Sequence, residues 1–404
     1  MSSSNGTSVA IAGAGLAGLC LARRLVRAGI DVQVYERDPG PFVRRQGYRI
    51  TVDADGLGAL RDSLPDESYE LAVATGGDPG GFFRFTNSRL RDAFKLTFKA
   101  APDAGRQMDR QVLRAILLAG LEERVHYGKA ATSVESAGGE MVLGFADGTE
   151  ARASVVVGAD GIGSALRARI APGAEPVDSG MAGIYGRTPL TPGLLPEALR
   201  KSGVLAIGDE PGRAFFFTSM RFAEAPDKAF GRLGHQAPPG DDYVMWGLVL
   251  RADEVSRDSP HTSARGLADG FHPLVARMVD AADEEATIVS TFAVGRRPGV
   301  WALPRATLVG DAVHAMPPFG AHGGNTALRD AALLGGRLAA AHANGDPVES
   351  AILAYQNEMV PYAFKAVDTA AGMMRRLTGS GRFARWLLTG VLPRLHRVTV
   401  PAAP

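Results

Sequence analysis

The chain has 404 residues, 46% hydrophobic and 22% charged, with a formal net charge of +1 and a single cysteine, Cys20. This composition excludes a collagen-like or wholly disordered chain, and the balanced charge gives no general attraction to nucleic acid or to an acidic membrane surface. One cysteine excludes internal disulfides, iron–sulfur clusters and cysteine-based zinc sites, so we expect no metal centre.

The N-terminal region shows no targeting or membrane-spanning signal. Residues 1–7 are polar and lack the basic residues that precede a signal-peptide core. The uncharged run from Ser8 to Ala22 has 15 residues and three glycines. It is shorter than the roughly 20 apolar residues that span a bilayer. We therefore expect a soluble, cytoplasmic protein that is a monomer or a weak homo-oligomer.

The first predicted unit is a strand, a glycine-rich turn and a helix. The strand covers Ser8–Ala12, a GxGxxG pattern occupies residues 13–18, and an amphipathic helix runs over Leu16–Ala28. A second strand, Asp31–Tyr35, ends at Glu36, which lies 18 positions beyond the last glycine of the pattern. This order and spacing are typical of a dinucleotide-binding βαβ unit. A glycine-rich turn in an unrelated α/β fold is the alternative interpretation.

Each position of this unit has a mechanical role. Gly13 permits the tight turn, Gly15 lets the backbone approach a pyrophosphate, and Gly18 lets the helix pack on the strand. The start of the helix offers free N–H groups and a partial positive charge to the phosphates. Glu36 is expected to accept hydrogen bonds from an adenosine ribose and to repel a 2′-phosphate.

The middle of the chain indicates a mostly β region. Two short runs, Phe82–Phe85 and Phe94–Phe98, predict an antiparallel hairpin. Two further strands, Phe215–Phe217 and Tyr243–Leu250, are separated by turns rich in glycine and proline. Helical periodicity returns only near Ala264.

A second strand–turn–helix unit interrupts this region. The apolar run Val155–Val157 predicts a buried parallel strand, and the following turn carries Asp160, Ser164 and Arg167. Alone, this segment could be a second phosphate loop, but it lacks the GxGxxG spacing.

A third unit lies late in the chain. The strand Thr307–Val309 precedes Asp311, which can accept hydrogen bonds from a polyol. The following segment, residues 317–320, is rich in proline and glycine and can lie flat beneath a planar ring. A helix that opens near Gly323 points its positive end at whatever lies there.

These units predict an α/β fold whose nucleotide-binding domain is discontinuous in sequence. The Rossmann-like domain is expected to comprise residues 1–75, 105–175 and 296–346, an inserted and mostly antiparallel β-sheet substrate domain residues 76–104 and 176–295, and C-terminal helices residues 347–404. The C-terminal helices are expected to break at Pro361 and Pro393.

Taken together, the three units resemble the FAD-dependent aromatic hydroxylases, the single-component flavoprotein monooxygenases. That family carries GxGxxG near the N-terminus, D-G-x-x-S-x-x-R in mid-chain and G-D-A-x-H-x-x-P-P late. The residues that match the second and third motifs are Asp160, Gly161, Ser164 and Arg167, and Gly310, Asp311, His314, Pro317 and Pro318. Order and spacing agree over roughly residues 8–345, and Met108–Leu118 looks like the corresponding helix of the tetracycline-inactivating subgroup.

The resemblance implies a non-covalent FAD cofactor. Its predicted contacts are Gly13, Gly15, Leu16, Ala17, Gly18, Glu36, Arg37, Arg45, Arg110, Asp160, Asp311, Gly323, Gly324 and Asn325. Arg45 occupies the place of a family arginine near the flavin, although Arg44 could take it instead, and Arg110 is expected at the pyrophosphate. His322 stands where many relatives carry Gln, and we expect it to be structural.

The resemblance also implies a reaction cycle. NADPH or NADH docks transiently, because the chain has only one GxGxxG, and reduces FAD by hydride transfer. Reduced flavin reacts with O2 to form a C4a-hydroperoxide, which delivers one oxygen atom to an aromatic or polycyclic substrate. Pro317 and Pro318 would shape the dry pocket in which this chemistry occurs.

Specificity is expected to come from the β-sheet domain. By register, Arg187, Phe217 and Met245 point from the sheet toward the flavin, and Phe319 completes the substrate set. Arg187 could also polarise a phenol or carbonyl oxygen; surface exposure for Arg187 and simple core packing for the others are the alternatives. The tetracycline subgroup carries a polar residue on the strand of Met245, so Met245 favours a flatter or less polar substrate such as an aromatic polyketide.

Other functions stay open at this point. A flavin halogenase would need a W-x-W-x-I-P motif, which is missing. A flavin-dependent dehydrogenase or reductase on the same fold, or a flavin-binding module without turnover, are the alternatives. The basic, amphipathic segment Arg382–Leu388 could touch a membrane, but a helix packed on the FAD domain is the favoured interpretation. Hydroxylation and Baeyer–Villiger oxidation are not distinguished.

Overall fold

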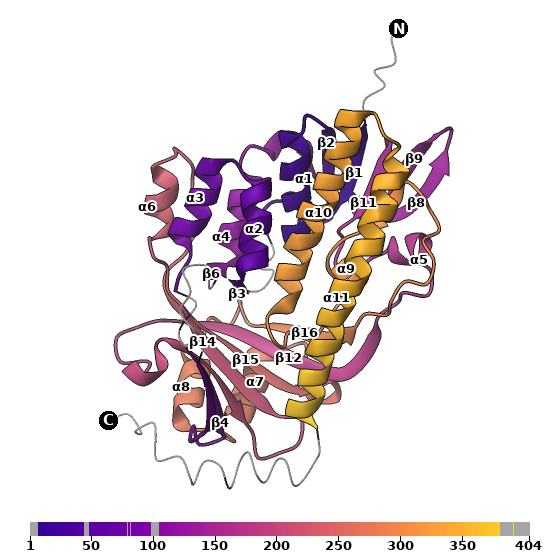
Figure 1. Ribbon diagram of the computed structural model, residues 1–404. Coiled ribbons are helices and arrows are strands. Elements are labelled where there is room, and N and C mark those ends of the chain that lie inside the picture. Colours follow the sequence, from indigo (N-terminus) through magenta and orange to yellow (C-terminus); the bar gives the residue numbers. More distant parts are fainter. Residues whose placement is uncertain are drawn as a thin grey trace.

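The computed structural model describes residues 7–43, 48–78, 80, 82–97, 105–379 and 391. Figure 1 shows an upper part, in which helices surround a parallel sheet, above a broad sheet that is antiparallel except for the parallel pair of β13 (Ser202–Ile207) and β4 (Phe82–Asn87). The long helix α11 (Val348–Thr378) runs beside both parts, with Ile352 and Met359 in the upper core and Met374 against the lower sheet.

The upper part is built on a five-stranded parallel sheet. In spatial order its strands are β17 (Ala306–Leu308), β11 (Val155–Gly158), β1 (Ser8–Ala12), β2 (Asp31–Glu36) and β7 (Val125–Tyr127). Strand β11 is buried throughout its length, and so is β1 after its first residue. Continuous apolar runs form such strands because both faces of the sheet are covered.

Helices cover this sheet and form the larger core. They are α1 (Leu16–Arg27), α2 (Ala54–Ser63), α3 (Asp66–Thr75), α4 (Arg110–Leu118), α5 (Arg167–Ile170), α9 (Asp311–His314) and α10 (His322–Asn344). Helix α10 packs closely on α1, and a Cβ on Gly335 would lie 2.5 Å from the Cγ atom of Arg24.

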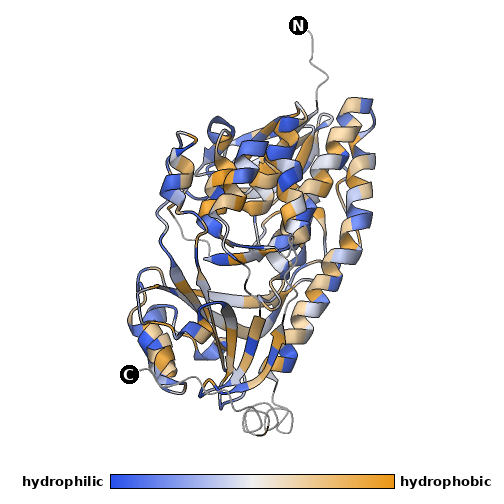
Figure 2. Cartoon of the chain, turned by 60° about the vertical axis from the view of Figure 1, so that its left-hand side comes forward, coloured by the Kyte–Doolittle hydropathy of each residue, from blue (hydrophilic) through white to orange (hydrophobic). Residues whose placement is uncertain are grey.

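The lower part is a seven-stranded sheet. In spatial order its strands are β16 (Ile288–Val294), β12 (Val177–Pro189), β15 (Tyr243–Arg251), β14 (Ala214–Met220), β13 (Ser202–Ile207), β4 (Phe82–Asn87) and β5 (Asp92–Thr97). One face packs on α7 (Pro260–Ala268) and α8 (Pro273–Asp280) through fully buried side chains such as Phe215 and Trp246. Figure 2 shows that hydrophobic and hydrophilic residues alternate along the helices and strands of both parts.

Two smaller sheets complete the fold. Strands β3 (Arg49–Val52) and β6 (Arg106–Asp109) pair antiparallel, and β8 (Ala131–Ala137), β9 (Glu140–Phe145) and β10 (Glu150–Ala153) form a three-stranded sheet. The sequence did not predict the three-stranded sheet. Short helices occur at α6 (Pro226–Gly231) and in three 3-10 turns, Glu122–Arg124, Glu197–Leu199 and Ala252–Glu254.

The predicted fold class is confirmed, and the predicted strands start within one residue of the observed ones over β1, β2, β11 and β17. The break predicted at Pro361 is wrong, because α11 continues through it, and the break predicted at Pro393 lies outside the described residues. Proline inside a helix costs about 3 kcal/mol, but Met359, Ala363 and Phe364 are buried on either side of it and hold the helix in place.

Two further segments differ from their predictions. Met108 and the following residue belong to β6, so the helix expected over Met108–Leu118 begins at Arg110. Helix α6 lies in the segment assigned to the β-sheet domain, yet Ala229 and Phe230 pack into the upper core.

Candidate active site

A large cavity lies between the carboxyl ends of the parallel strands and the lower sheet. Its volume is about 1970 Å³. Ligand pockets usually enclose roughly 300–1000 Å³, so this cavity has room for more than one small molecule. Its wall runs from the glycine loop after β1 to Met245 on the lower sheet and to Met373 on α11.

The three glycines of the first loop have different surroundings. Gly13 has a φ of +110°, and a Cβ there would lie 2.3 Å from the carbonyl oxygen of Ala159. A Cβ on Gly18 would lie 2.0 Å from the carbonyl oxygen of Gly13. A Cβ on Gly15 would meet nothing within 4 Å, and Gly15 lines the cavity. The geometry thus supports ligand approach at Gly15 and close packing at Gly18, which does not line the cavity.

The acid at the end of β2 joins this loop. The side chain of Glu36 is buried; its Oε2 atom accepts a hydrogen bond from the N–H of Ala14 at 2.7 Å, and its Oε1 atom accepts one from the N–H of Asp38 at 3.0 Å. Carboxylate oxygens carry further lone pairs, so Glu36 can still accept from a ribose hydroxyl. Arg37, like Glu36, lines the cavity.

The second motif connects two loops of the site. The Oδ2 atom of Asp160 accepts from the N–H of Ala165 at 2.9 Å, and the hydroxyl of Ser164 accepts from the N–H of Arg167 at 3.1 Å. The Nε atom of Arg167 donates to the carbonyl of Ala312 at 2.6 Å. Arg167 therefore fixes the third motif against the second, and Asp160 lines the cavity with its Oδ1 atom buried and unpartnered in the described chain.

A buried acid supports the third motif from behind. The Oδ2 atom of Asp330 accepts from the N–H of Gly310 at 2.9 Å and from the Nε2 atom of His314 at 2.5 Å. Its Oδ1 atom accepts from the hydroxyl of Tyr362 at 2.7 Å. Burial alone would lower the pKa of His314, but the charge and hydrogen bond of Asp330 raise it overall. This cluster holds the turn that carries Asp311 into the cavity.

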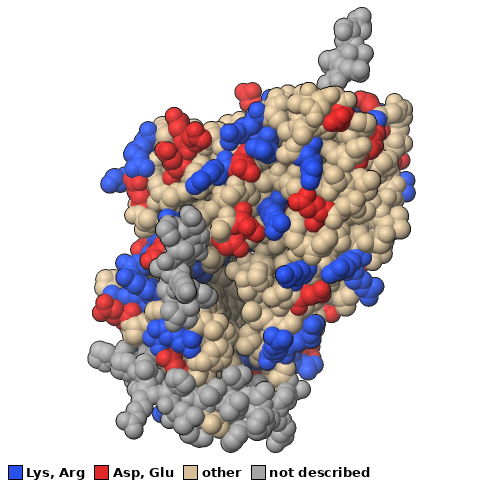
Figure 3. All heavy atoms as spheres, viewed as in Figure 1, with Lys and Arg blue, Asp and Glu red and all other residues tan. Residues whose placement is uncertain are grey.

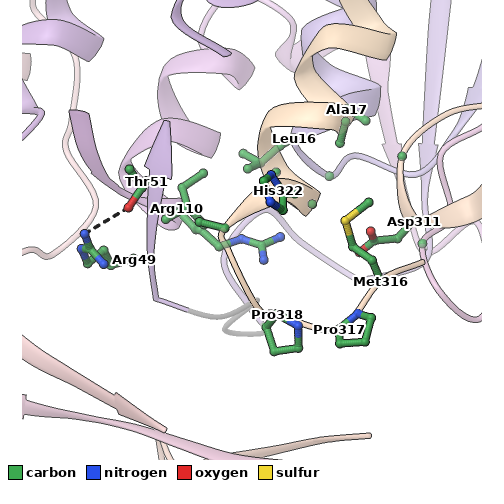
Figure 4. A pocket seen from close by; sticks show the side chains of 18 of the residues that line it. Leu16, Ala17, Arg49, Thr51, Arg110, Asp311, Met316, Pro317, Pro318 and His322 are labelled. Atoms are coloured by element: carbon green, nitrogen blue, oxygen red, sulfur yellow. Dashed lines mark hydrogen bonds between the residues drawn. The ribbon is translucent and has the colours of Figure 1, made fainter. Parts of the chain in front are cut away.

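Two arginines of the upper part reach the cavity. Figure 4 shows Arg110 extended toward the loop with Pro317 and Pro318, and Arg49 beside Thr51. The Nε atoms of both arginines are buried without a partner in the described chain. Burial lowers the pKa of Arg49 to about 10. Burial also lowers the pKa of Arg110, against the opposing effect of nearby carboxylates.

The start of α10 forms another wall. Gly323 and Gly324 line the cavity, as does His322, which Figure 4 places above the two prolines. Asn325 does not: its Oδ1 atom accepts from the N–H of Asp53 at 2.9 Å, and its Nδ2 atom donates to the carbonyl of Thr51 at 2.9 Å. Asn325 therefore connects the start of α10 to the end of β3, and the contact predicted between Asn325 and the cofactor has no support in its position.

Ala321, at the N-cap of α10, has a φ of +58°, in the left-handed region that favours glycine. We expect Ala321→Gly to raise the free energy of unfolding by about 1 kcal/mol. Glycine removes a backbone strain of about 1–2 kcal/mol in the left-handed region, but it also increases the conformational entropy of the unfolded chain, which offsets part of this stabilisation. Ala340→Gly, at an exposed interior position of α10, is the control and should lower the free energy by about 1 kcal/mol. Thermal unfolding at saturating FAD measures the stability of both variants. If Ala321→Gly lost as much stability as Ala340→Gly, backbone strain at Ala321 would be contradicted.

One predicted substrate residue points the wrong way. Phe217 pairs with Trp246 across β14 and β15, and both are fully buried against α7 and α8. The cavity is lined instead by Phe216, the next residue, because side chains alternate along a strand. Met245 and Phe319 line the cavity as predicted.

Arg187 is a second predicted substrate residue that lies outside the lining of the cavity. It pairs with Met245 across β12 and β15, but it does not line the cavity. Its guanidinium instead lies 5.5 Å from the ring centroid of Tyr243. The catalytic role predicted for Arg187 therefore has no support in its position.

Four further predicted residues line the cavity, and two predicted features lie outside the described residues. Leu16, Ala17, Pro317 and Pro318 line the cavity, whereas Arg45 and the segment Arg382–Leu388 lie outside the described residues. The lining residues that the sequence did not single out include Arg49, Phe83, Arg106, Tyr185, Phe216 and Thr218. Alternation along β15 could have identified the facing strand positions, but the strand partners could not be derived.

The residues of the cavity fit an FAD molecule. The open space at Gly15 suits a pyrophosphate, and the unpartnered polar atoms of Arg110 and Asp160 suit its polar groups. In the described ranges, no group of His, Cys, Asp and Glu could hold a metal ion, and no helix could cross a membrane. Figure 3 shows acidic and basic side chains interspersed on the visible face.

Comparisons with known proteins agree with this site. The family described as FAD binding domain matches residues 124–370, and an NAD(P)-binding Rossmann-like domain matches residues 11–58. A dual O-methyltransferase/FAD-dependent monooxygenase of Phaeosphaeria nodorum is 31% identical over 92% of this chain, which spans only 45% of that protein. The 2-heptyl-3-hydroxy-4(1H)-quinolone synthase of Pseudomonas aeruginosa is 29% identical over 81% of this chain and 79% of its own length.

Solved structures share the whole architecture. A FAD-containing monooxygenase described as putative, from Photorhabdus luminescens, has a TM-score of 0.77 and 27% identity, over 92% of this chain and 99% of that one. The tetracycline destructase Tet(51) has a TM-score of 0.65 at 15% identity, over 98% of both chains, and this likeness shows the fold alone. With its motifs, cavity and family match in agreement, the chain belongs to the FAD-dependent aromatic hydroxylase family and carries FAD as its cofactor.

Proposed function

We propose that this chain is an NAD(P)H-dependent FAD monooxygenase that inserts one oxygen atom of O2 into an aromatic or polycyclic small molecule. The observation that carries the proposal is the continuity of the cavity, which joins the dinucleotide loop at Gly15 to an apolar wall at Met245. A dinucleotide site alone would need only the upper half of this space.

Residues of the upper part would hold the FAD molecule. The loop of Gly15 and the side chain of Arg110 would hold the pyrophosphate, Glu36 the adenosine and Asp311 the ribityl chain. When bound, FAD supplies hydride acceptance from NAD(P)H and activation of O2. The start of α10 directs its positive end into the cavity and would stabilise negative charge there.

The remaining wall would keep the reacting centre dry. Pro317, Pro318 and Phe319 follow one another at the junction of the two parts and present few polar groups to the cavity. Exclusion of water strengthens electrostatic interactions and limits wasteful side reactions. No side chain of a Ser–His–Asp type is needed for this chemistry, because the cofactor carries the difficult step.

The proposal is tested by oxygen labelling. The FAD-loaded protein is mixed with NADPH or NADH, 18O2 and a panel of aromatic compounds, and the products are weighed by mass spectrometry. We expect substrate-dependent NAD(P)H consumption and one 18O atom in the product, whereas 16O2 in H218O should give no label. Reduction of FAD without labelled product would indicate a dehydrogenase, and failure of reduction would indicate a binding module; either result would overturn the proposal.

A further inference from the structure

Two rows of residues on the lower sheet form one side of the cavity, which we call the floor. The first, which we call the Tyr185 row, follows direct cross-strand pairs from β12 to β4 and contains Tyr185, Gly247, Phe216, Leu205 and Phe85. The second, the Met245 row, lies two residues away from the first on β15, β14, β13 and β4 and continues onto β5; it contains Met245, Thr218, Gly203, Phe83 and Leu96. All of these residues line the cavity.

Glycines in and beside the Tyr185 row make room for one aromatic ring. A Cβ on Gly247 would lie 2.7 Å from the ring of Tyr185, and a Cβ on Gly183 would lie 2.7 Å from the same ring and its hydroxyl. The Tyr185 side chain therefore lies along the sheet over both glycines rather than standing away from it. Any larger residue at either position would push the ring into the cavity.

The same arrangement recurs three strands away. A Cβ on Gly203 would lie 2.6 Å from the ring of Phe83, which lies over that position. The rings of Phe83 and Phe216 are stacked, with centroids 5.9 Å apart and an interplanar angle of 10°. The floor of the cavity thus carries aromatic side chains at both ends and in its middle.

The floor of the cavity is larger than a single aromatic ring. Adjacent strands are about 4.8 Å apart, so the Tyr185 row extends roughly 19 Å across five strands, and the two rows are about 7 Å apart. A flat molecule of several fused rings could lie over this floor, and its faces would stack on the rings below.

A charged group stands at the edge of the floor that is nearest the upper part. Arg49 lines the cavity, and its Nη2 atom donates a hydrogen bond to the hydroxyl of Thr51 at 3.1 Å, while its Nε atom has no partner among the described residues. Arg49 lies close enough to Tyr243 for each group to affect the ionisation of the other. Tyr243 is two residues before Met245 on β15, so the arginine is placed beyond the Met245 row.

We propose that this floor selects a flat, fused-ring aromatic substrate that carries an acidic oxygen, with the rings stacked on Tyr185 and the oxygen paired with Arg49. The proposal rests on the proposed monooxygenase function and adds the specificity-determining residues. Gly183 and Gly247 act through Tyr185, because they let its ring lie flat. Arginine suits the acidic oxygen because its guanidinium stays charged and donates through several N–H groups.

The first test compares ligands on the FAD-loaded protein, with dissociation constants measured from changes in the flavin absorption spectrum. The probes are anthraquinone-2-carboxylate, its neutral analogue 2-hydroxymethylanthraquinone, and the single-ring acid salicylate. We expect anthraquinone-2-carboxylate to bind at least about tenfold more tightly than either of the other two, which corresponds to about 1.4 kcal/mol. Equal or tighter binding of salicylate would overturn the proposal.

The second test addresses the flat ring through a double-mutant cycle. Gly247→Ala should weaken anthraquinone-2-carboxylate about tenfold, because the displaced Tyr185 ring enters the space of the ligand. In a Tyr185→Leu background the same change should have little further effect. Gly266→Ala, where a Cβ meets nothing within 4 Å on α7, is the matched control. Equal effects of Gly247→Ala in both backgrounds would contradict the role of Tyr185.

The third test addresses the charge. Arg49→Met should weaken anthraquinone-2-carboxylate but leave 2-hydroxymethylanthraquinone unchanged, and Arg49→Lys should restore part of the difference. A matching loss of affinity for the neutral probe would overturn the pairing with Arg49.

Oxygen labelling separates this proposal from the proposed function. Labelled product with a preference for single-ring acids contradicts only the proposed role of the floor. Tight binding of fused-ring compounds without labelled product from any compound contradicts only the monooxygenase function.

Discussion

Asp330→Ala is expected to lower the free energy of unfolding by about 3–5 kcal/mol, because removing one partner of a buried charged pair leaves the other uncompensated. Asp330 is fully buried and accepts hydrogen bonds from Gly310, His314 and Tyr362. The alanine would leave all three donors without that acceptor. Because Gly310 precedes Asp311, we also expect the purified variant to retain less FAD than the wild type.

The controls for Asp330 separate the hydrogen bonds from the charge. Tyr362→Phe removes one of the three bonds and should cost only about 1 kcal/mol. Asp330→Asn keeps an acceptor and should be intermediate. Chemical denaturation at saturating FAD measures stability, and flavin absorbance after gel filtration measures occupancy. A loss for Asp330→Ala no larger than that for Tyr362→Phe would contradict the central role of the carboxylate.

The same cluster predicts a pH dependence of stability. The pKa of His314 is raised in the folded protein above its ordinary value of 6.5. A raised folded-state pKa stabilises the fold fully below the unfolded pKa, and the contribution is lost as pH rises through the folded value. The stability difference between wild type and Asp330→Asn should therefore be largest below about pH 6.5 and shrink at higher pH. A difference that grows with pH would contradict this direction.

Gly15→Ala is expected to weaken FAD binding by about tenfold or more, or about 1.4 kcal/mol, while the protein folds as the wild type does. The added Cβ meets no protein atom within 4 Å and occupies the cavity at the place where a pyrophosphate would approach the backbone. Backbone strain is not involved, because Gly15 has an ordinary φ of −77°. Fluorescence titration of the FAD-depleted protein with FAD measures the affinity.

Two other glycine-to-alanine changes serve as controls for Gly15→Ala. Gly58→Ala, at an exposed position of α2 where a Cβ also meets nothing, should leave FAD affinity unchanged. Gly18→Ala would place a Cβ 2.0 Å from the carbonyl oxygen of Gly13 and should disrupt the loop itself, with loss of both stability and FAD. Unchanged affinity in Gly15→Ala would place the pyrophosphate elsewhere in the cavity.

Locally encoded features were predicted well from the sequence. The parallel strands β1 and β11 consist of continuous apolar residues, and each is followed by a turn whose spacing has a steric reason. Cofactor loops of this kind depend on residues close together in the chain. That is why Glu36, Asp160 and Asp311 were all expected at the site and do line the cavity.

Features that depend on pairing between distant segments were predicted less well. Phe217 was expected in the cavity and Phe216 lines it, because a strand exchanges its two faces with a shift of one residue. Asn325 lies in the right motif, yet it is bound to Asp53 and Thr51, which are far away in sequence.

The sequence by itself therefore determined the α/β class, the glycine loops and the acids that follow buried strands, since these arise from residues within a few turns of one another. Only the tertiary structure decided which faces of β12, β14 and β15 line the cavity, and which buried arginines and rings stand opposite the cofactor loops. The physical reason is that strand register and the close approach over Gly183 and Gly247 arise between segments distant in the chain, where local patterns carry no information.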